Sequence, residues 1–159
     1  MASFTLEEIE KATGASLLQK GEDAFVEGVS TDTRTISRGE LFIALIGENF
    51  NGHEFLKRAV LSGASAVMIS DASYGKDIDA HVSVFLVKDT KKGLEDLAHF
   101  HRMRFHVPVI GVTGSNGKTT TKDMITSILR TRFHVTATEK NFNNEIGLSM
   151  TLLSMTAET

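Results

Sequence analysis

Short apolar runs alternate with segments of helical periodicity over the first hundred residues. Four runs have the length and the Val, Ile and Thr content of strands: 24–34, 41–47, 64–70 and 81–87. Between and after them, residues 55–60 and 90–105 place their apolar side chains on one side of a helix. Because strands that alternate with helices pair mostly in parallel, the pattern predicts an α/β fold.

Capping residues mark the expected helix ends. Thr5 followed by Glu8 predicts a capping box that starts a short helix, and Gly14 ends this helix. Thr90 is placed to cap the longer helix, although Gly93 weakens its first turn.

Pro108, the chain's only proline, marks a boundary between two parts of the chain. Proline disfavours helix in the residue before it and suits the first position of a strand, so the longer helix should end near residue 106. We therefore expect a small α/β domain over 1–106 and the start of a second domain over 107–159.

The second part is predicted to be the first β-α-β unit of an ATPase domain with a parallel sheet. A strand at 108–112 leads into a glycine-rich loop, a helix starts at Lys118, and another strand covers 133–139. The apolar residues of this helix are expected to face inward: Met124, Ile125, Ile128 and Leu129. Such a unit leaves one sheet face uncovered, so it is either poorly ordered or covered by a partner chain.

Composition and charge exclude several classes of function. Apolar residues make up 41% and charged residues 23%, as in ordinary globular proteins. The net charge of -3 provides no cationic surplus for nucleic acid. No apolar run approaches the ~18 residues of a membrane span, and no signal peptide is visible, so we expect no membrane insertion and a cytoplasmic location. The lack of cysteine leaves only oxygen or imidazole as metal ligands.

The segment GVTGSNGKTT (111–120) has the features of a phosphate-binding loop. Gly114 and Gly117 allow close approach of the backbone to a phosphate, and the N–H groups at the start of the next helix favour an anion. Lys118 adds charge for the β- and γ-phosphates, and the Thr119 hydroxyl is placed for Mg²⁺. The expected nucleotide contacts are Thr113, Gly114, Ser115, Asn116, Gly117, Lys118, Thr119 and Thr120. The alternative is a turn that only packs a helix against a strand.

The glycine spacing of this loop identifies a narrower class. The commonest pattern, G-x-x-x-x-G-K-[ST], requires glycine where the chain has Val112. The observed TGSNGKT instead resembles T-G-[ST]-x-G-K-[ST] of the Mur ligase family and the related folylpolyglutamate synthetases. That resemblance implies an enzyme that couples ATP hydrolysis to amide-bond formation, with Lys118 as a catalytic residue.

Two further segments extend the resemblance over nearly the whole chain. NFNNEIGLSMTLL (141–153) is similar to the family member that adds D-alanyl-D-alanine to UDP-N-acetylmuramoyl-tripeptide, and 30–64 is similar to the UDP-binding domains of this member and of another Mur ligase. The resemblance implies a ligase of peptidoglycan precursor synthesis that uses ATP and Mg²⁺. Gly93 and Ser149 stand where the family usually has alanine and proline, which affects helix geometry rather than chemistry.

Glu145 is the only carboxylate in NFNNEIG and follows the second expected strand. Because Mg²⁺ prefers hard oxygen ligands and keeps several waters, Thr119, Glu145 and phosphate oxygens would complete a site. The alternative is an exposed glutamate favoured by the helix dipole. One of the asparagines at 141, 143 and 144 should cap a helix. The resemblance implies a substrate contact here, with Asn143 and Asn144 as candidates.

The segment STDTR (30–34) supplies hydroxyl groups and a guanidinium after a strand, which suit a uracil edge and a diphosphate. Asp32 and Arg34 could instead pair only to shape the loop. The resemblance favours UDP contacts from Ser30, Thr31 and Arg34. Weaker candidates are Asn49, Asn51 and His53.

Two rival functions remain open beside the ligase. A P-loop kinase would need a downstream acidic strand but not the pattern at 30–64, and a non-catalytic module would bind a UDP-sugar alone. The family continues past residue 159 with further domains that carry other catalytic groups, so we expect this chain alone to be inactive as a ligase. The charge runs Lys91-Lys92 and Arg102-Met103-Arg104 are interpreted as solvated helix surface.

Overall fold

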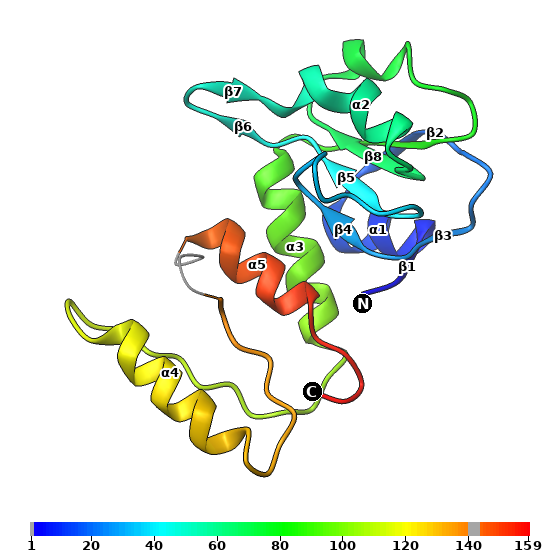
Figure 1. Ribbon diagram of the computed structural model, residues 1–159. Helices are drawn as coiled ribbons and strands as arrows, with labels where there is room; N and C mark the ends of the chain where they lie inside the picture. Colours follow the sequence, from blue (N-terminus) through cyan, green and yellow to red (C-terminus); the bar gives the residue numbers. More distant parts are fainter. Residues whose placement is uncertain (1, 140–143) are drawn as a thin grey trace.

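The computed structural model describes residues 2–139 and 144–159, and its first part is built on a mixed five-stranded sheet (Figure 1). The strand order is β2-β9-β8-β5-β4, with β2 antiparallel to β9 and the other pairs parallel. The strands are β2 (Ser16–Gln19), β4 (Val29–Ser30), β5 (Leu41–Ile43), β8 (Ala66–Ile69) and β9 (Ser83–Leu86). The predicted α/β class is confirmed. The edge strand β2 was missed because only alternate residues of its four are half-buried.

Short antiparallel pairs accompany the sheet. The expected strand at 24–34 divides into β3 (Phe25–Val26), which pairs with β1 (Phe4–Thr5), and β4. The apolar run at 41–47 divides in the same way, because β6 (Ile46–Gly47) turns away from the sheet to pair with β7 (Phe50–Asn51). Figure 1 shows this hairpin projecting from the sheet.

Helices cover both faces of the sheet, and neighbouring strand residues point to opposite faces. Leu41, Ile43 and Met68 face a core formed with α1 (Leu6–Thr13) and α3 (Thr90–Arg102). Phe42 and Val67 face a second core formed with α2 (Leu56–Leu61). Two 3-10 helices complete this side: η1 (Gly52–Phe55) and η2 (Ala72–Gly75). The first hundred residues therefore supply both cores, and one later helix, α5, adds to the core shared by α1 and α3.

The helix boundaries follow from local capping chemistry. The Thr5–Glu8 capping box is confirmed, and Gly14 ends α1 in a left-handed conformation at φ 66°. The prediction that Thr90 caps α3 was wrong by one residue. Asp89 accepts the Lys91 and Lys92 N–H groups, while the buried Thr90 hydroxyl donates to the Ala44 carbonyl at 2.8 Å.

Gly93 has a packing role in α3. A Cβ atom at this position would lie 2.7 Å from the Met68 sulfur atom, so glycine allows α3 to approach β8 closely. Glycine in place of the family's usual alanine is thus explained by the short distance between α3 and the sheet.

The second part of the chain contains α4 (Lys118–Leu129) and α5 (Glu145–Leu153). The segments 108–112 and 133–139 run beside α4 without forming strands in the described chain, contrary to the prediction. A strand requires a paired backbone, and among the described residues neither segment pairs with a neighbouring strand. Only the helix of the expected β-α-β unit is therefore regular here.

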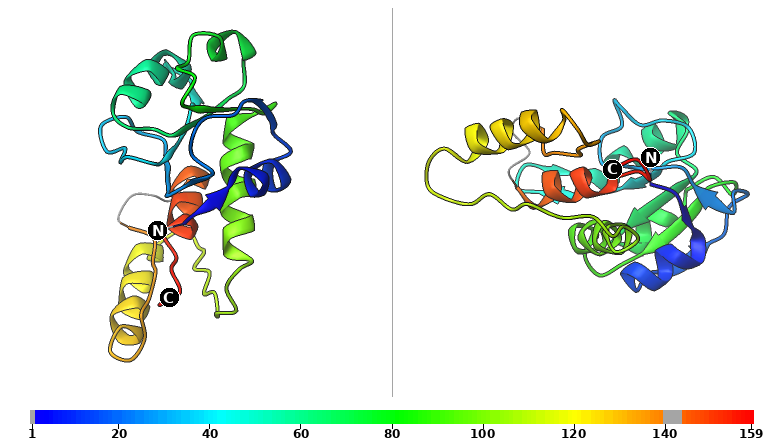
Figure 2. Two further views of the ribbon diagram at one scale, coloured as in Figure 1. Left: turned by 90° about the vertical axis from the view of Figure 1, so that its right-hand side faces the viewer. Right: turned by 90° about the horizontal axis from the view of Figure 1, so that it is seen from below.

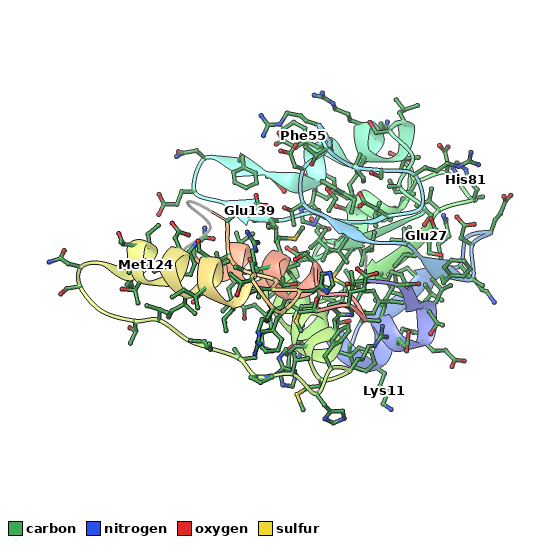
Figure 3. The ribbon with its side chains drawn as sticks, turned by 60° about the horizontal axis from the view of Figure 1, so that its bottom comes forward. Lys11, Glu27, Phe55, His81, Met124 and Glu139 are labelled. Carbon is green, nitrogen blue, oxygen red and sulfur yellow. The ribbon has the colours of Figure 1, made fainter. Side chains whose placement is uncertain are left out.

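The inward face predicted for α4 is only half correct. Ile125 and Leu129 are partly buried against Pro108 and Val135 in an apolar cleft. Met124 and Ile128 are 61% and 67% exposed, and Figure 3 places Met124 on α4 at the margin of the molecule. The exposed pair lacks the covering sheet on which the prediction depended.

Helix α5 lies between α3 and α4 in every view (Figures 1 and 2). Its residue Leu153 joins the core that contains Leu94 and Leu97 of α3. Of the helices that the structure describes, none is long and apolar enough to cross a membrane.

Candidate functional site

The loop before α4 has a backbone suited to an anion. Gly114 and Gly117 have φ values of 142° and 77°, which non-glycine residues rarely adopt. Gly117 is the N-cap residue of α4 and provides no side-chain acceptor. Of the four described helices with eight or more residues, α1, α3 and α5 begin at the side-chain caps Thr5, Asp89 and Asn144. The first N–H groups of α4 are thus left for another acceptor.

Lys118 brings a positive charge back to the same loop. Its Nζ donates to the Gly114 carbonyl at 2.5 Å, so the ammonium group lies over the turn rather than extending away from it. All the predicted nucleotide contacts, residues 113–120, are exposed. The structure therefore brings the lysine, both glycines and the helix start together, in an arrangement that can bind phosphate.

The start of α5 carries the other predicted ligands. The Asn144 side-chain oxygen accepts the Gly147 N–H at 2.9 Å, which confirms that one of the asparagines caps a helix. Asn141 and Asn143 lie outside the described residues. Glu145 is the first residue of α5, and its carboxylate forms an ion pair with the Lys91 ammonium group of α3. This pairing raises the pKa of Lys91.

The two predicted metal ligands, Thr119 and Glu145, provide the types of donor atom that suit a magnesium ion shared with phosphate, and in the structure the Glu145 carboxylate is engaged by Lys91. Among the described residues, no three His, Asp or Glu side chains come together as a metal cluster. Thr119 and Glu145 are exposed residues in the first turns of α4 and α5, and they offer a hydroxyl and a carboxylate oxygen. Such a set suits Mg²⁺, which keeps waters and shares phosphate oxygens, better than an ion that needs a full protein cage.

The loop after β4 is held by its own side chains. Ser30 is buried, and its hydroxyl donates to the Asp32 carbonyl at 3.1 Å. The Arg34 guanidinium contacts both carboxylate oxygens of Asp32 and holds the pKa of that carboxyl at about 2. The pairing considered as an alternative therefore exists. Arg34 nevertheless remains largely exposed, as Thr31 does in part, so both can also meet a ligand.

His53 is a structural residue within the described chain. Its Nε2 accepts the Ser70 N–H at 2.9 Å, which places its proton on Nδ1, where it is donated to the Asn51 side-chain oxygen at 2.8 Å. Burial lowers the pKa of His53, in agreement with a neutral ring. Because both nitrogens are used, this histidine ties the β6–β7 hairpin to the end of β8 rather than contacting a ligand.

Lys91, Lys92 and Arg104 are exposed, as the interpretation of solvated surface predicted, but Lys91 and Arg104 also make long-range contacts. Lys91 reaches Glu145, as described above. Arg104, just beyond α3, pairs with Glu8 at 2.8 Å and lies over the Phe4 and Phe100 rings. No local pattern could have revealed these contacts, since the partners are far apart in the sequence.

The comparisons with known proteins agree with the geometry of the loop. The description "Mur ligase family, catalytic domain" matches residues 25–102, and "Mur ligase middle domain" matches residues 112–159. The UDP-N-acetylmuramoyl-tripeptide--D-alanyl-D-alanine ligase of Bacillus subtilis is 46% identical over 138 residues, which are 87% of this chain and 30% of that protein. The ligase of the same name from Escherichia coli is 37% identical over 158 residues, which are 99% of this chain and 33% of that protein.

Solved structures show the same relationship. A crystal structure of MurF from Acinetobacter baumannii matches with a TM-score of 0.88 and 31% identity, over 99% of this chain and 34% of that one. MurF ligase from Thermotoga maritima in complex with ADP matches with a TM-score of 0.70 and 32% identity, over 79% of this chain and 28% of that one. The chain spans about a third of the length of these relatives. Its two matched segments, its fold and its phosphate loop show together that the chain belongs to the Mur ligase family.

Proposed function

We propose that this chain provides the UDP-substrate region and the phosphate loop of an ATP-dependent ligase. The reaction would join D-alanyl-D-alanine to UDP-N-acetylmuramoyl-tripeptide, as the names of the relatives at 37% and 46% identity state for those proteins. The observation that carries the proposal is the loop over 113–120, where two left-handed glycines, an uncapped helix start and Lys118 converge.

The chain is proposed to contain two functional domains. One would cover 1–106 and recognise the UDP-sugar, and the other would begin at 107 and bind ATP. The interval between the two family matches, from 103 to 111, includes this boundary. Because α5 packs into the core of the first part, the two domains would share a continuous apolar contact.

In the proposed ATP site, the loop before α4 and the start of this helix would bind the phosphates of the nucleotide. The N–H groups at the start of α4 would hold the β- and γ-phosphates, and Lys118 would turn from the Gly114 carbonyl to the transferred phosphoryl group. Thr119 and Glu145 would hold Mg²⁺, which offsets negative charge on the phosphates when bound. Phosphoryl transfer obtains most of its catalysis from such positioning and charge stabilisation.

The bond changes of the proposed reaction balance in two steps. The terminal carboxylate of the tripeptide takes the γ-phosphoryl group of ATP, which forms an acyl phosphate and releases ADP. The amine of D-alanyl-D-alanine then attacks the acyl carbon, the amide forms, and phosphate leaves. Ser30, Thr31 and Arg34 would bind the UDP group, and Asn143 and Asn144 would be further substrate contacts. The binding energy of the UDP group, which does not react, would help to orient the reacting carboxylate.

Calorimetric titration with ADP tests the nucleotide site. We expect Lys118→Met to weaken ADP binding by about tenfold or more, since it removes a charge-assisted phosphate contact. Lys122→Met is the matched control, because Lys122 lies on the same helix and its Nζ contacts the Thr138 carbonyl at 2.6 Å. Equal weakening by both variants would contradict a specific role of Lys118.

A separate titration with UDP-N-acetylmuramoyl-tripeptide tests the proposed UDP-sugar site in the first domain. Arg34→Met should weaken binding of the sugar nucleotide while leaving ADP binding unchanged. Sugar-nucleotide binding by a chain that binds no ADP would favour a non-catalytic UDP-sugar module instead. Binding of neither ligand would reject both functions.

A further inference from the structure

Helices α3 and α5 lie side by side at an angle, with their N-terminal ends on the same side, and a polar contact joins them at each end (Figures 1 and 2). At the N-terminal ends, the Lys91 ammonium group contacts the Glu145 carboxylate. At the C-terminal ends, the His101 Nε2 atom lies 3.0 Å from the Met155 carbonyl oxygen. Each contact joins residues 54 positions apart, so the two helices are held in one register.

Lys91 occupies an unfavourable position on its own helix. It lies in the first turn of α3, where the positive end of the helix dipole disfavours a cation. Its neighbour Lys92 forms an ion pair with Asp96 one turn along the same helix, whereas Lys91 reaches across to α5. The long-range contact therefore explains the position of this lysine better than local helix stability does.

The pair is also poorly placed to stabilise the fold. The Lys91 and Glu145 side chains are 47% and 69% exposed, and ion pairs in water contribute little because solvent and salt screen them. A weak, exposed pair on a carboxylate can be displaced by a stronger cation. Magnesium and manganese ions bind carboxylate oxygens directly, and their charge repels an ammonium group at the same oxygen.

We propose that Lys91 holds the Glu145 carboxylate while no divalent cation is bound, and that the cation displaces it. The inference rests on the metal role proposed for Glu145. In this arrangement the lysine competes with the cation, and cation binding releases the N-terminal end of the α3–α5 contact while the His101 contact holds the other end. Metal occupancy in the nucleotide site is thereby communicated to the helix that covers the UDP-substrate sheet.

Titration with Mn²⁺ alone, followed by the electron paramagnetic resonance signal of free Mn²⁺, tests the competition. We expect Lys91→Met to bind Mn²⁺ about twofold to fivefold more tightly than the unmodified chain, in keeping with the modest strength of an exposed pair. Lys92→Met is the matched control, because it removes an adjacent lysine of α3 whose partner is Asp96. Its Mn²⁺ affinity should be unchanged.

Glu145→Gln separates failure of this inference from failure of the metal assignment. If Glu145→Gln weakens Mn²⁺ binding but Lys91→Met leaves it unchanged or weakens it, the competition is refuted and the metal role survives. If Glu145→Gln has no effect on Mn²⁺ affinity, the metal assignment and the inference both fail. Absence of detectable Mn²⁺ binding in every variant would likewise overturn the inference, since the lysine would have no competitor.

Discussion

The sheet region over 2–102 and the α4 region over 107–139 use apolar residues in different ways. The first region buries both sheet faces under helices, and residues such as Phe42, Ile43 and Met68 have almost no exposed surface. The second region leaves Val109, Ile128 and other large apolar side chains more than half exposed. The first region therefore has a packed core, to which α5 also contributes, whereas the second presents a loop whose first helical N–H groups have no side-chain cap.

Helix α5 connects the two regions. By sequence it belongs to the middle-domain match over 112–159, yet its inward residues pack into the core of the sheet region. Figure 2 shows α5 beside α3 in both views. The interval between the two family matches, residues 103–111, therefore does not coincide with the boundary of the apolar core.

The largest expected difference between the regions is in core packing. Leu94 of α3 is fully buried, so Leu94→Ala should lower the free energy of unfolding by about 2–5 kcal/mol through lost contacts and a cavity. Leu148 of α5 is 54% exposed, so Leu148→Ala is the control and should lower the free energy of unfolding far less. Urea denaturation followed by circular dichroism measures the free energy of unfolding of both variants. Equal decreases would contradict the proposed difference between the buried core and the exposed face of α5.

Acid should weaken the sheet region and its contact with α5. Burial lowers the pKa of His53 and His101 from the ordinary value of 6.5, so the unfolded chain takes up protons first as pH falls. The stability from each neutral ring is complete above pH 6.5 and is lost as pH falls toward the folded pKa. Each histidine should add a slope of up to about 1.4 kcal/mol per pH unit.

His101→Gln provides the matched variant for this pH dependence. Glutamine keeps an N–H donor for the Met155 carbonyl but does not titrate. The slope of the free energy of unfolding against pH, between pH 7.5 and 5.5, should therefore become shallower by up to about 1.4 kcal/mol per pH unit, the contribution of one proton. The slope is measured from urea unfolding at several pH values. An unchanged slope would show that His101 is not part of the acid sensitivity.

A smaller effect is expected at the start of α5. Asn144→Ala removes the side-chain acceptor of the Gly147 N–H and should cost about 1 kcal/mol, as other lost N-caps do. Asn116→Ala changes an exposed loop asparagine before α4, whose helix has no side-chain cap, and should cost less than about 0.5 kcal/mol. Chemical denaturation of both variants compares the capped start with the uncapped one.

The two regions also differ in what their sequences reveal. The sheet region could be predicted because its strands lie in short continuous apolar runs at 41–47, 64–70 and 81–87, and the Thr5 cap is likewise a local signal. The phosphate loop was recognised for the same reason, since its residues are consecutive. Asp89 as the cap of α3 was missed because Thr90 offers the same chemistry one position later.

The errors concern features that depend on distant residues. Strands at 108–112 and 133–139 require partner strands, and the apolar pattern of a segment does not show whether a partner is available. Among the described residues, neither segment is paired. The Lys91–Glu145 and His101–Met155 contacts arise only when α5 packs on α3. The predicted ligand contacts of Ser30, Thr31 and the loop residues stay predictions, because a sequence shows which groups are available but not whether a ligand meets them.

The smallest expected effect completes the comparison. Ile128 lies on α4 with 67% of its surface exposed, so Ile128→Ser removes little buried apolar area and should change the free energy of unfolding by less than about 0.5 kcal/mol. The same residue type in the sheet region, Ile43, is fully buried, and Ile43→Ser should be strongly destabilising. Urea denaturation combined with light scattering measures stability and association together. A loss above about 1.5 kcal/mol for Ile128→Ser would show that this face is covered in solution, and a concentration-dependent loss would identify the cover as another copy of the chain.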